Sequence, residues 1–325
     1  MDTLPDFELL TPKNAQEAVS LHAERDEARY MAGGTDFMPN LRRGIESPMA
    51  VIDLSGIEEM RGIEILDDGR LRIGASTTLV ELCRDERIIE NFPAVAEAAE
   101  QIAGTSHRQV ATVGGNLCLD TRCLYYNQSE WWRSANNYCL KKEGEICHVA
   151  PTGKTCRAAY SGDLAPTMLI HGAMVEIASA TGSRTIDLAE LYQEDGADFL
   201  LLEPGELMVA VTIEPRSGYS MAYKKVRVRG GVDFPLVGVA AALKIESGKI
   251  DDLKIGLTGT NSKPVRLEGL EDVFGKPMDD ETLKVIEKLV QRQIQPMRST
   301  FTPSHYRRKV ALNVTRRLIS RLATT

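Results

Sequence analysis

Six cysteines are the residues of this 325-residue chain with the clearest potential for chemistry. Two of them, Cys83 and Cys118, stand apart from the rest and are expected to be ordinary small apolar side chains. The other four lie in one short stretch, at Cys123, Cys139, Cys147 and Cys156. In a reducing compartment, clustered cysteines bind metal more often than they form disulfides. The stretch therefore predicts a metal site.

The spacing of these four cysteines leaves the kind of metal open. It is C-x15-C-x7-C-x8-C, without a C-x2-C pair, so the usual zinc-finger and bacterial ferredoxin spacings are absent. Four thiolates suit a zinc ion or a [4Fe–4S] cluster, and free thiols in a loop are the third alternative. His148, beside Cys147, is more typical of a solvated or hydrogen-bonded histidine than of a ligand.

The same stretch is rich in aromatic residues, at Tyr125, Tyr126, Trp131, Trp132 and Tyr138. Residues 119–159 show neither helical nor strand periodicity, and loops this long are usually functional or disordered. The aromatics argue against disorder. They favour a small core for the loop itself, and shielding of a cluster from water is a second role compatible with the first.

Two glycine loops are the other candidates for chemistry. Gly33-Gly34-Thr35-Asp36 follows a predicted strand and precedes a predicted helix, and Thr112-Val113-Gly114-Gly115-Asn116 is a similar loop about 80 residues later. Glycines let the backbone approach a ligand, and amides near a helix start can bind phosphate. Two such loops could clamp a pyrophosphate, which predicts a dinucleotide site; ordinary turns are the alternative. Neither loop is a G-x-G-x-x-G motif or a P-loop.

Hydrophobic periodicity predicts the elements that position these residues. A β-α-β-loop-α-β pattern spans residues 7–54, and it is followed by a hairpin at 62–73 and a helix at 92–103. The C-terminal third predicts strands and then helices, at 220–226, 237–245, 253–257, 280–293 and 304–322. The predicted fold class is α+β. The expected domains are residues 1–55, residues 56–215 with an insertion at about 119–159, and residues 216–325.

Composition excludes several classes of function. The net charge is −7 and no basic stripe stands out, so nucleic acid is not an expected partner. No run approaches the ~20 apolar residues of a membrane helix. The first residues lack the basic and apolar regions of a signal peptide, which makes the cytoplasm the expected location.

Three motifs resemble one family. Ala32–Asp36, Arg108–Asn116 and Ser161–Pro166 occur in the order typical of the flavin-binding subunit of the xanthine dehydrogenase and carbon monoxide dehydrogenase family of molybdenum hydroxylases. The resemblance covers the whole chain. It implies a vanillyl-alcohol-oxidase-type (PCMH-like) FAD-binding domain of two subdomains, followed by a C-terminal α+β domain. FAD would lie between the first two subdomains, with its pyrophosphate on the segments Ala32–Asp36 and Thr112–Asn116.

The resemblance also implies roles for two further residues. Asp163 would hydrogen-bond the ribityl chain of FAD, although chemistry alone makes it an N-cap near a helix start. Lys224 falls where the family often places a basic residue near the flavin, and a solvated strand lysine is the alternative. A small departure from the family's pattern, His107-Arg108-Gln109, leaves the local contacts open.

The cysteine stretch is a large departure from the family's usual pattern. Asn116 and Ser161 lie 45 positions apart, where most relatives have about a dozen residues. The insertion resembles the iron–sulfur loop of the 4-hydroxybenzoyl-CoA reductases. That resemblance implies a [4Fe–4S] cluster held by Cys123, Cys139, Cys147 and Cys156.

The expected function is electron transfer rather than substrate chemistry, since no nucleophile–base set is evident on this chain. By resemblance, one partner subunit carries the molybdenum cofactor and another carries two [2Fe–2S] clusters, in a dimer of heterotrimers. The complex would reduce 4-hydroxybenzoyl-CoA to benzoyl-CoA with electrons from a low-potential donor such as ferredoxin. One alternative is the FAD subunit of an oxidative hydroxylase with a structural metal loop. Another is a scaffold without cofactor.

Overall fold

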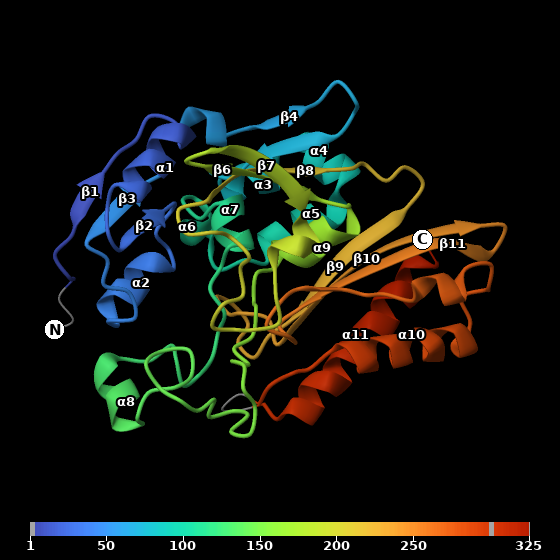
Figure 1. Ribbon diagram of the computed structural model, residues 1–325. Helices are drawn as coiled ribbons and strands as arrows, with labels where there is room; N and C mark the ends of the chain where they lie inside the picture. The colour runs from blue at the N-terminus through green and yellow to red at the C-terminus, as the bar shows by residue number, and fades with distance from the viewer. Residues whose placement is uncertain (1–3, 299–301, 325) are drawn as a thin grey trace.

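The computed structural model describes residues 4–298 and 302–324, and the described strands form three sheets that follow one another along the chain (Figure 1). We call the segments that carry them the first, second and third parts of the chain. No helix within the two described ranges is long and apolar enough to cross a membrane.

The first part is a parallel sheet with strand order β1-β3-β2. Its elements are β1 (Glu8–Leu10), α1 (Ala15–Ala23), β2 (Ala28–Met31), α2 (Phe37–Arg42) and β3 (Ala50–Asp53). The Asn14 side chain begins α1 by accepting a hydrogen bond from the Glu17 amide at 2.8 Å. This order of elements confirms the predicted pattern. It places the first glycine loop between β2 and α2, at the carboxyl end of a parallel strand.

The second part is an antiparallel sheet with strand order β4-β5-β8-β6-β7. Its strands are β4 (Ile63–Ile65), β5 (Leu71–Gly74), β6 (Met174–Ser179), β7 (Gly182–Asp187) and β8 (Leu207–Ile213). Its helices are α3 (Leu79–Arg84), α4 (Glu86–Asn91), α5 (Pro93–Glu100), α6 (Thr105–Arg108), α7 (Val113–Leu117) and α9 (Leu164–Ile170). The predicted hairpin is β4-β5, and its turn contains Gly69 at a φ of 83°, a conformation that favours glycine.

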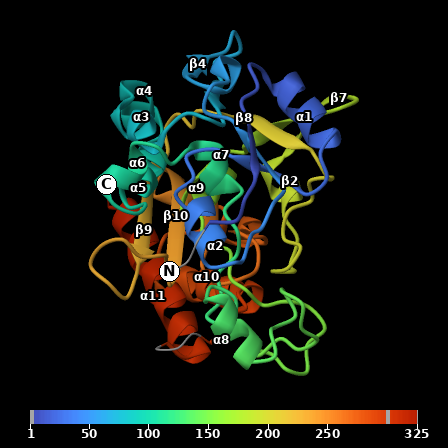
Figure 2. The ribbon, with the colours of Figure 1, turned by 90° about the vertical axis from the view of Figure 1, so that its left-hand side faces the viewer.

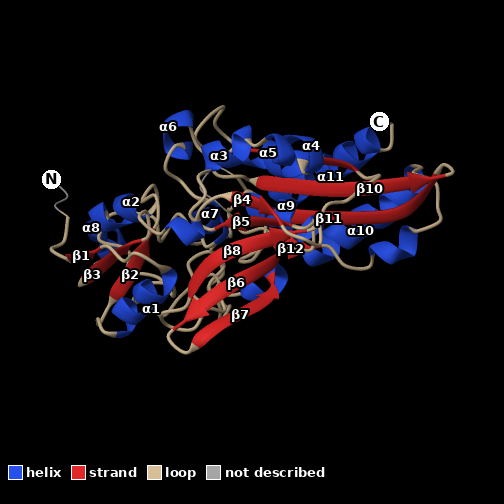
Figure 3. Cartoon of the chain, turned by 90° about the horizontal axis from the view of Figure 1, so that it is seen from above, coloured by secondary structure: helices blue, strands red, loops and turns tan. Residues whose placement is uncertain are grey.

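The third part is an antiparallel sheet covered by helices on both faces (Figures 1 and 3). Its elements are β9 (Ser220–Val226), β10 (Val237–Glu246), β11 (Lys249–Thr258), β12 (Val265–Arg266), α10 (Asp280–Gln293) and α11 (Ser304–Leu322). Along β10, Ala240 and Ala242 pack into the core shared with the second part, while Val239 and Leu243 pack into the core shared with α10 and α11. The alternation follows from the two-residue period of a strand. The three parts confirm the predicted α+β class.

Residues 119–159, which we call the cysteine segment, extend away from the three sheets (Figures 1 and 2). The segment contains one helix that the sequence did not predict, α8 (Glu130–Ala135), which begins where the Ser129 hydroxyl accepts from the Trp132 amide at 3.4 Å. The ends of the segment meet in a backbone bridge. The Arg122 amide donates to the Ala159 carbonyl at 2.7 Å, and the Ala159 amide donates to the Arg122 carbonyl at 2.9 Å.

Candidate functional site

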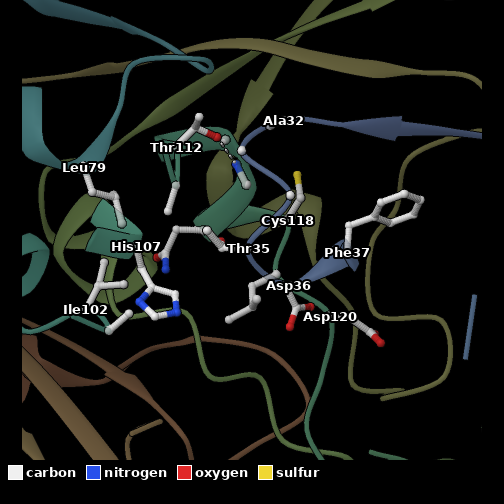
Figure 4. A pocket seen from close by; sticks show the side chains of 18 of the residues that line it. Ala32, Thr35, Asp36, Phe37, Leu79, Ile102, His107, Thr112, Cys118 and Asp120 are labelled. Atoms are coloured by element: carbon white, nitrogen blue, oxygen red, sulfur yellow. Dashed lines mark hydrogen bonds between the residues drawn. The ribbon is translucent and has the colours of Figure 1, made fainter. Parts of the chain in front are cut away.

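A cavity of about 560 Å³ lies between the first and second parts of the chain, and we call it the large cavity. Its walls come from the two glycine loops, the start of the cysteine segment, the residues just before α9, and β9. Figure 4 shows Thr35 and Asp36 from the first glycine loop facing the same space as His107, Ile102 and Asp120. The two glycine loops therefore belong to one site.

The first glycine loop lines the large cavity with all of its residues from Ala32 to Asp36. Gly33 has no space for a side chain, because an added Cβ would lie 1.8 Å from the Val110 carbonyl oxygen. Gly34 has a φ of 68°, which side chains rarely tolerate. Both glycines are thus required for the loop to pass between the cavity and the segment before α7.

The second glycine loop begins α7. The Thr112 hydroxyl accepts from the Gly115 amide at 3.1 Å, an N-cap that is drawn in Figure 4. Four of the five predicted residues line the large cavity, namely Thr112, Gly114, Gly115 and Asn116. Val113 is fully buried and does not line it. The Asn116 side chain oxygen accepts from the amide at the start of α9 at 3.0 Å, which fixes the third motif beside the second.

Asp163 lies in the wall of the large cavity and forms a buried ion pair. Its Oδ2 atom is 2.9 Å from the Lys225 Nζ atom, and its Oδ1 atom accepts from the Tyr223 hydroxyl at 2.5 Å. Burial raises the pKa of Asp163, while the ammonium and the hydroxyl counteract that rise. Asp163 precedes α9 but its side chain does not cap that helix, so the N-cap alternative is not observed.

The basic residue of β9 that lines the large cavity is Lys225, not the predicted Lys224. Lys224 is exposed, and Lys225 is buried. Adjacent strand residues point to opposite faces of the sheet, so an assignment that misses by one position selects the wrong face. Tyr223 and Lys225 lie on the face of β9 that packs against Asp163, and both hydrogen-bond its carboxylate. The sequence motifs do not show which face of the strand is buried.

A second, much smaller cavity lies in the cysteine segment, and we call it the cysteine cavity. Its lining includes all four cysteines predicted to bind metal, Cys123, Cys139, Cys147 and Cys156. The backbone bridge between Arg122 and Ala159 brings the first and last of them together. Between these, the Lys142 amide donates to the Cys139 carbonyl at 2.8 Å in a tight turn. The four cysteines therefore line one cavity although their spacing follows no common motif.

The thiols in the cysteine cavity influence one another. Burial raises the pKa of Cys123 to about 11 and that of Cys156 to about 12, and neighbouring thiols contribute to both shifts. Among the described residues, no three His, Cys, Asp or Glu side chains form a group that could hold a metal ion. The His148 Nε2 atom lies 2.5 Å from the Tyr138 carbonyl oxygen, as expected for a hydrogen-bonded histidine, and its ring stacks on Tyr125.

Comparison with known families settles what kind of chain this is. The FAD binding domain of molybdopterin dehydrogenases matches residues 5–216, and the CO dehydrogenase flavoprotein C-terminal domain matches residues 221–322. The chain belongs to the FAD-binding subunits of the xanthine dehydrogenase and CO dehydrogenase family. This FAD-binding subunit is therefore part of an oxidoreductase of the molybdenum hydroxylase family.

Named relatives of the FAD-binding subunit have similar lengths. It is 27% identical over 307 residues to the xanthine dehydrogenase FAD-binding subunit of Escherichia coli O157:H7, covering 94% of this chain and 91% of the relative. It is 34% identical over 268 residues to the aldehyde oxidoreductase FAD-binding subunit PaoB of Escherichia coli (strain K12), covering 79% of this chain and 83% of the relative. A solved structure of Cu,Mo-CO dehydrogenase matches with a TM-score of 0.81 at 26% identity, covering 99% of both chains.

The large cavity fits FAD by the polar atoms that it offers. The Asn40 Oδ1 and Ser76 Oγ atoms are buried in its wall without a hydrogen-bond partner from the protein, and such atoms are normally satisfied by a ligand or water. Arg122 forms an ion pair with Asp36 there, and its guanidinium lies 4.5 Å from the centre of the Phe234 ring. No sequence motif distinguished these residues.

The remaining two cysteines differ from each other. Cys83 lies half-buried on α3, as expected of a small apolar side chain. Cys118 lines the large cavity, which its isolated position in the sequence did not indicate. Burial raises the pKa of Cys118 to about 12, so its thiol stays protonated and unreactive at neutral pH.

Proposed function

We propose that FAD occupies the large cavity, with its pyrophosphate on Ala32–Asp36 and Thr112–Asn116. The observation that carries this proposal is that two glycine loops, about 80 residues apart in the sequence, line a single cavity of about 560 Å³. Close backbone packing at Gly33 supports it, because it holds the first glycine loop against the Val110 carbonyl, next to the second glycine loop.

We assign Asp163 to the ribityl chain of FAD and Lys225, in place of Lys224, to the neighbouring basic position. A carboxylate offers about four acceptor positions, and the hydrogen bonds from Tyr223 and Lys225 use two of them. Asp163 can therefore still accept from a ribityl hydroxyl. The fixed ion pair holds its carboxylate in one orientation before the ligand arrives.

Bound FAD would supply electron transfer, accepting or donating electrons at its isoalloxazine ring. The chain's own residues bind the cofactor and shield it from water, and we assign no proton transfer to them. We propose that partner subunits carry the molybdenum cofactor and two [2Fe–2S] clusters in a dimer of heterotrimers. The names of the relatives support a hetero-oligomer, since they are called subunits or medium chains.

We also propose that Cys123, Cys139, Cys147 and Cys156 hold a [4Fe–4S] cluster, which would supply one-electron transfer at low potential. The supporting observation is that all four line one small cavity. A zinc ion needs its thiolates about 2.3 Å from one point, and the described side chains form no such group. A four-iron core is larger than one ion and spreads its thiolates further apart.

The direction of electron flow has two candidates. The names of the relatives, which include a xanthine dehydrogenase subunit and a CO dehydrogenase medium chain, favour an oxidative hydroxylase. The four-cysteine cavity favours the reductive candidate, in which ferredoxin supplies electrons for the conversion of 4-hydroxybenzoyl-CoA to benzoyl-CoA. We place the oxidative candidate first.

Elemental analysis tests both cofactors. The chain would be prepared without oxygen together with its partner subunits, as the parent, as Cys139→Ser and as the control Cys83→Ser. We expect FAD in all three, and about four fewer irons and sulfides per FAD in Cys139→Ser alone. Equal iron in the three preparations would refute the cluster, and a parent without FAD would refute the flavin site.

The rate of flavin reduction tests the direction of electron flow. The flavin absorbance of the complex would be followed after mixing with NADH or with reduced ferredoxin. Fast reduction by NADH supports the oxidative candidate, and fast reduction by ferredoxin alone supports the reductive one.

A further inference from the structure

A partly buried ion pair, in which the Asp120 side chain is 28% exposed, connects the walls of the two cavities. Lys141 lines the cysteine cavity, and its side chain is 5% exposed. Its Nζ atom lies 2.5 Å from the Oδ1 atom of Asp120, which lines the large cavity. The same pair of charges thus borders both proposed cofactor sites.

The position of the Lys141 ammonium is tightly fixed. Besides Asp120 it donates to the Thr121 hydroxyl oxygen at 2.5 Å and to the Gly196 carbonyl at 2.8 Å. An ammonium has three protons, and these three short contacts match them, while the Thr121 carbonyl oxygen lies further away at 3.5 Å. The Nζ atom also lies 4.5 Å from the centre of the Tyr126 ring, which is itself part of the lining of the cysteine cavity.

The backbone also connects the walls of the two cavities. Asp120 and Arg122 line the large cavity, and the next residue, Cys123, lines the cysteine cavity. Arg122 is paired with Asp36 of the first glycine loop. Two ion pairs, Asp36–Arg122 and Asp120–Lys141, therefore lie along the stretch from the first glycine loop to the wall beside the four cysteines.

A fixed charge beside a redox centre changes the relative stability of its two oxidation states. Water screens charges weakly when they are buried, so a positive charge there stabilises the state with the extra electron, and a negative charge opposes it. Net charge near an iron–sulfur cluster is one of the factors that set its potential.

We propose that Lys141 is a positioning residue that raises the reduction potential of the cluster held by the four cysteines, and that Asp120 limits this rise from the side of the flavin. The inference rests on the proposed function, since it requires a cluster in the cysteine cavity. It predicts effects of opposite sign for the two members of one ion pair.

The test is an anaerobic redox titration of the complex, with the reduced cluster monitored by electron paramagnetic resonance. For Lys141→Met we expect the equilibrium constant for one-electron reduction to fall about tenfold, which is about 59 mV. For Asp120→Asn we expect a rise. The matched control is Lys142→Met, because Lys142 is the next residue, is 32% exposed and pairs with Glu143 at the surface; we expect less than about a threefold change.

Equal shifts for Lys141→Met and Lys142→Met would overturn the inference, as would shifts of the same sign for Lys141→Met and Asp120→Asn, which indicate general loosening. If the Lys141→Met preparation lacks cluster iron, the Asp120→Asn variant alone tests the inference: a rise in its reduction potential supports the inference, and a fall overturns it. A parent without cluster iron refutes the proposed cluster and this inference with it. A parent that has the cluster but shows no opposite shifts refutes this inference alone.

Discussion

Replacing Lys225 with methionine would leave a buried carboxylate in the wall of the large cavity without its counterion. In the parent, the side chains of Lys225 and Asp163 are 1% and 4% exposed. Methionine retains an unbranched chain but removes the charge, so Asp163 keeps only the hydrogen bond from the Tyr223 hydroxyl. We therefore expect a large loss of stability.

The magnitude follows from the loss of one partner of a buried ion pair, which costs about 3–5 kcal/mol. We therefore expect Lys225→Met to lower the free energy of unfolding by about 4 kcal/mol.

Protonation of Asp163 sets the pH dependence, because burial raises its pKa in the parent and loss of the Lys225 ammonium, which lowers it, raises it further. A carboxyl whose pKa is raised in the folded state binds more protons there than in the unfolded state, so its stabilising contribution is present at low pH and lost as the pH rises. The difference between Lys225→Met and the parent should therefore shrink as the pH falls from 7 toward 4.

Urea unfolding followed by circular dichroism at several pH values measures the effect. The control is Lys224→Met, which removes an exposed charge from the neighbouring position and should change stability by less than about 0.5 kcal/mol. Adding Asp163→Asn to Lys225→Met should recover part of the loss, because no charge then remains buried. A loss below about 1 kcal/mol in Lys225→Met, or an equal loss in the control, would refute the reasoning.

Three further predictions follow from single positions. Gly33→Ala should abolish retention of FAD on gel filtration, because the added Cβ would lie 1.8 Å from the Val110 carbonyl oxygen, whereas Gly230→Ala, which meets no atom within 4 Å, should retain FAD. Burial lowers the pKa of His171 from 6.5 to about 4, so the free energy of unfolding should fall by up to about 3 kcal/mol as the pH drops through that range. His171→Gln should remove this pH dependence in urea unfolding. Arg133→Met should accelerate backbone hydrogen exchange across α8 but not in the sheets, because the fully buried guanidinium donates to carbonyls of the first part; unchanged exchange would contradict this.

Elements with a regular apolar pattern could be predicted from the sequence. The helices α10 and α11 begin and end at the predicted residues, because each carries one buried face and one polar face. The first of them also has a clear N-cap, in which the Asp279 side chain accepts from the Thr282 amide at 2.9 Å.

Helix α8 could not be predicted because its buried residue is not apolar. Arg133 is the member of α8 that is buried, and Trp131 is 77% exposed, so the helix has no apolar face to detect. Arg133 is stabilised by backbone carbonyls that lie about 90 residues away in the sequence, such as that of Gly44 at 2.8 Å. Such a contact has no local sequence signal.

The candidate site was predictable where glycines or cysteines marked it. The four clustered cysteines line one cavity and most residues of the two glycine loops line another. Asn40, Ser76 and Asp120 carried no such signal, since their positions depend on how the three parts pack. The correction from Lys224 to Lys225 has a similar cause, because strand register decides which of two adjacent lysines is buried.

The backbone bridge between Arg122 and Ala159 makes the cysteine segment a modular insertion. Because its two ends are hydrogen-bonded neighbours, a short turn could span the same gap, and the paths of the chain before Arg122 and after Ala159 do not depend on the length of what lies between. The entropy of closing such a loop grows slowly, by about 0.6 kcal/mol for each doubling of length. A chain of this fold can therefore acquire or lose the whole four-cysteine cavity at small thermodynamic cost, with the backbone on either side of the bridge left in place.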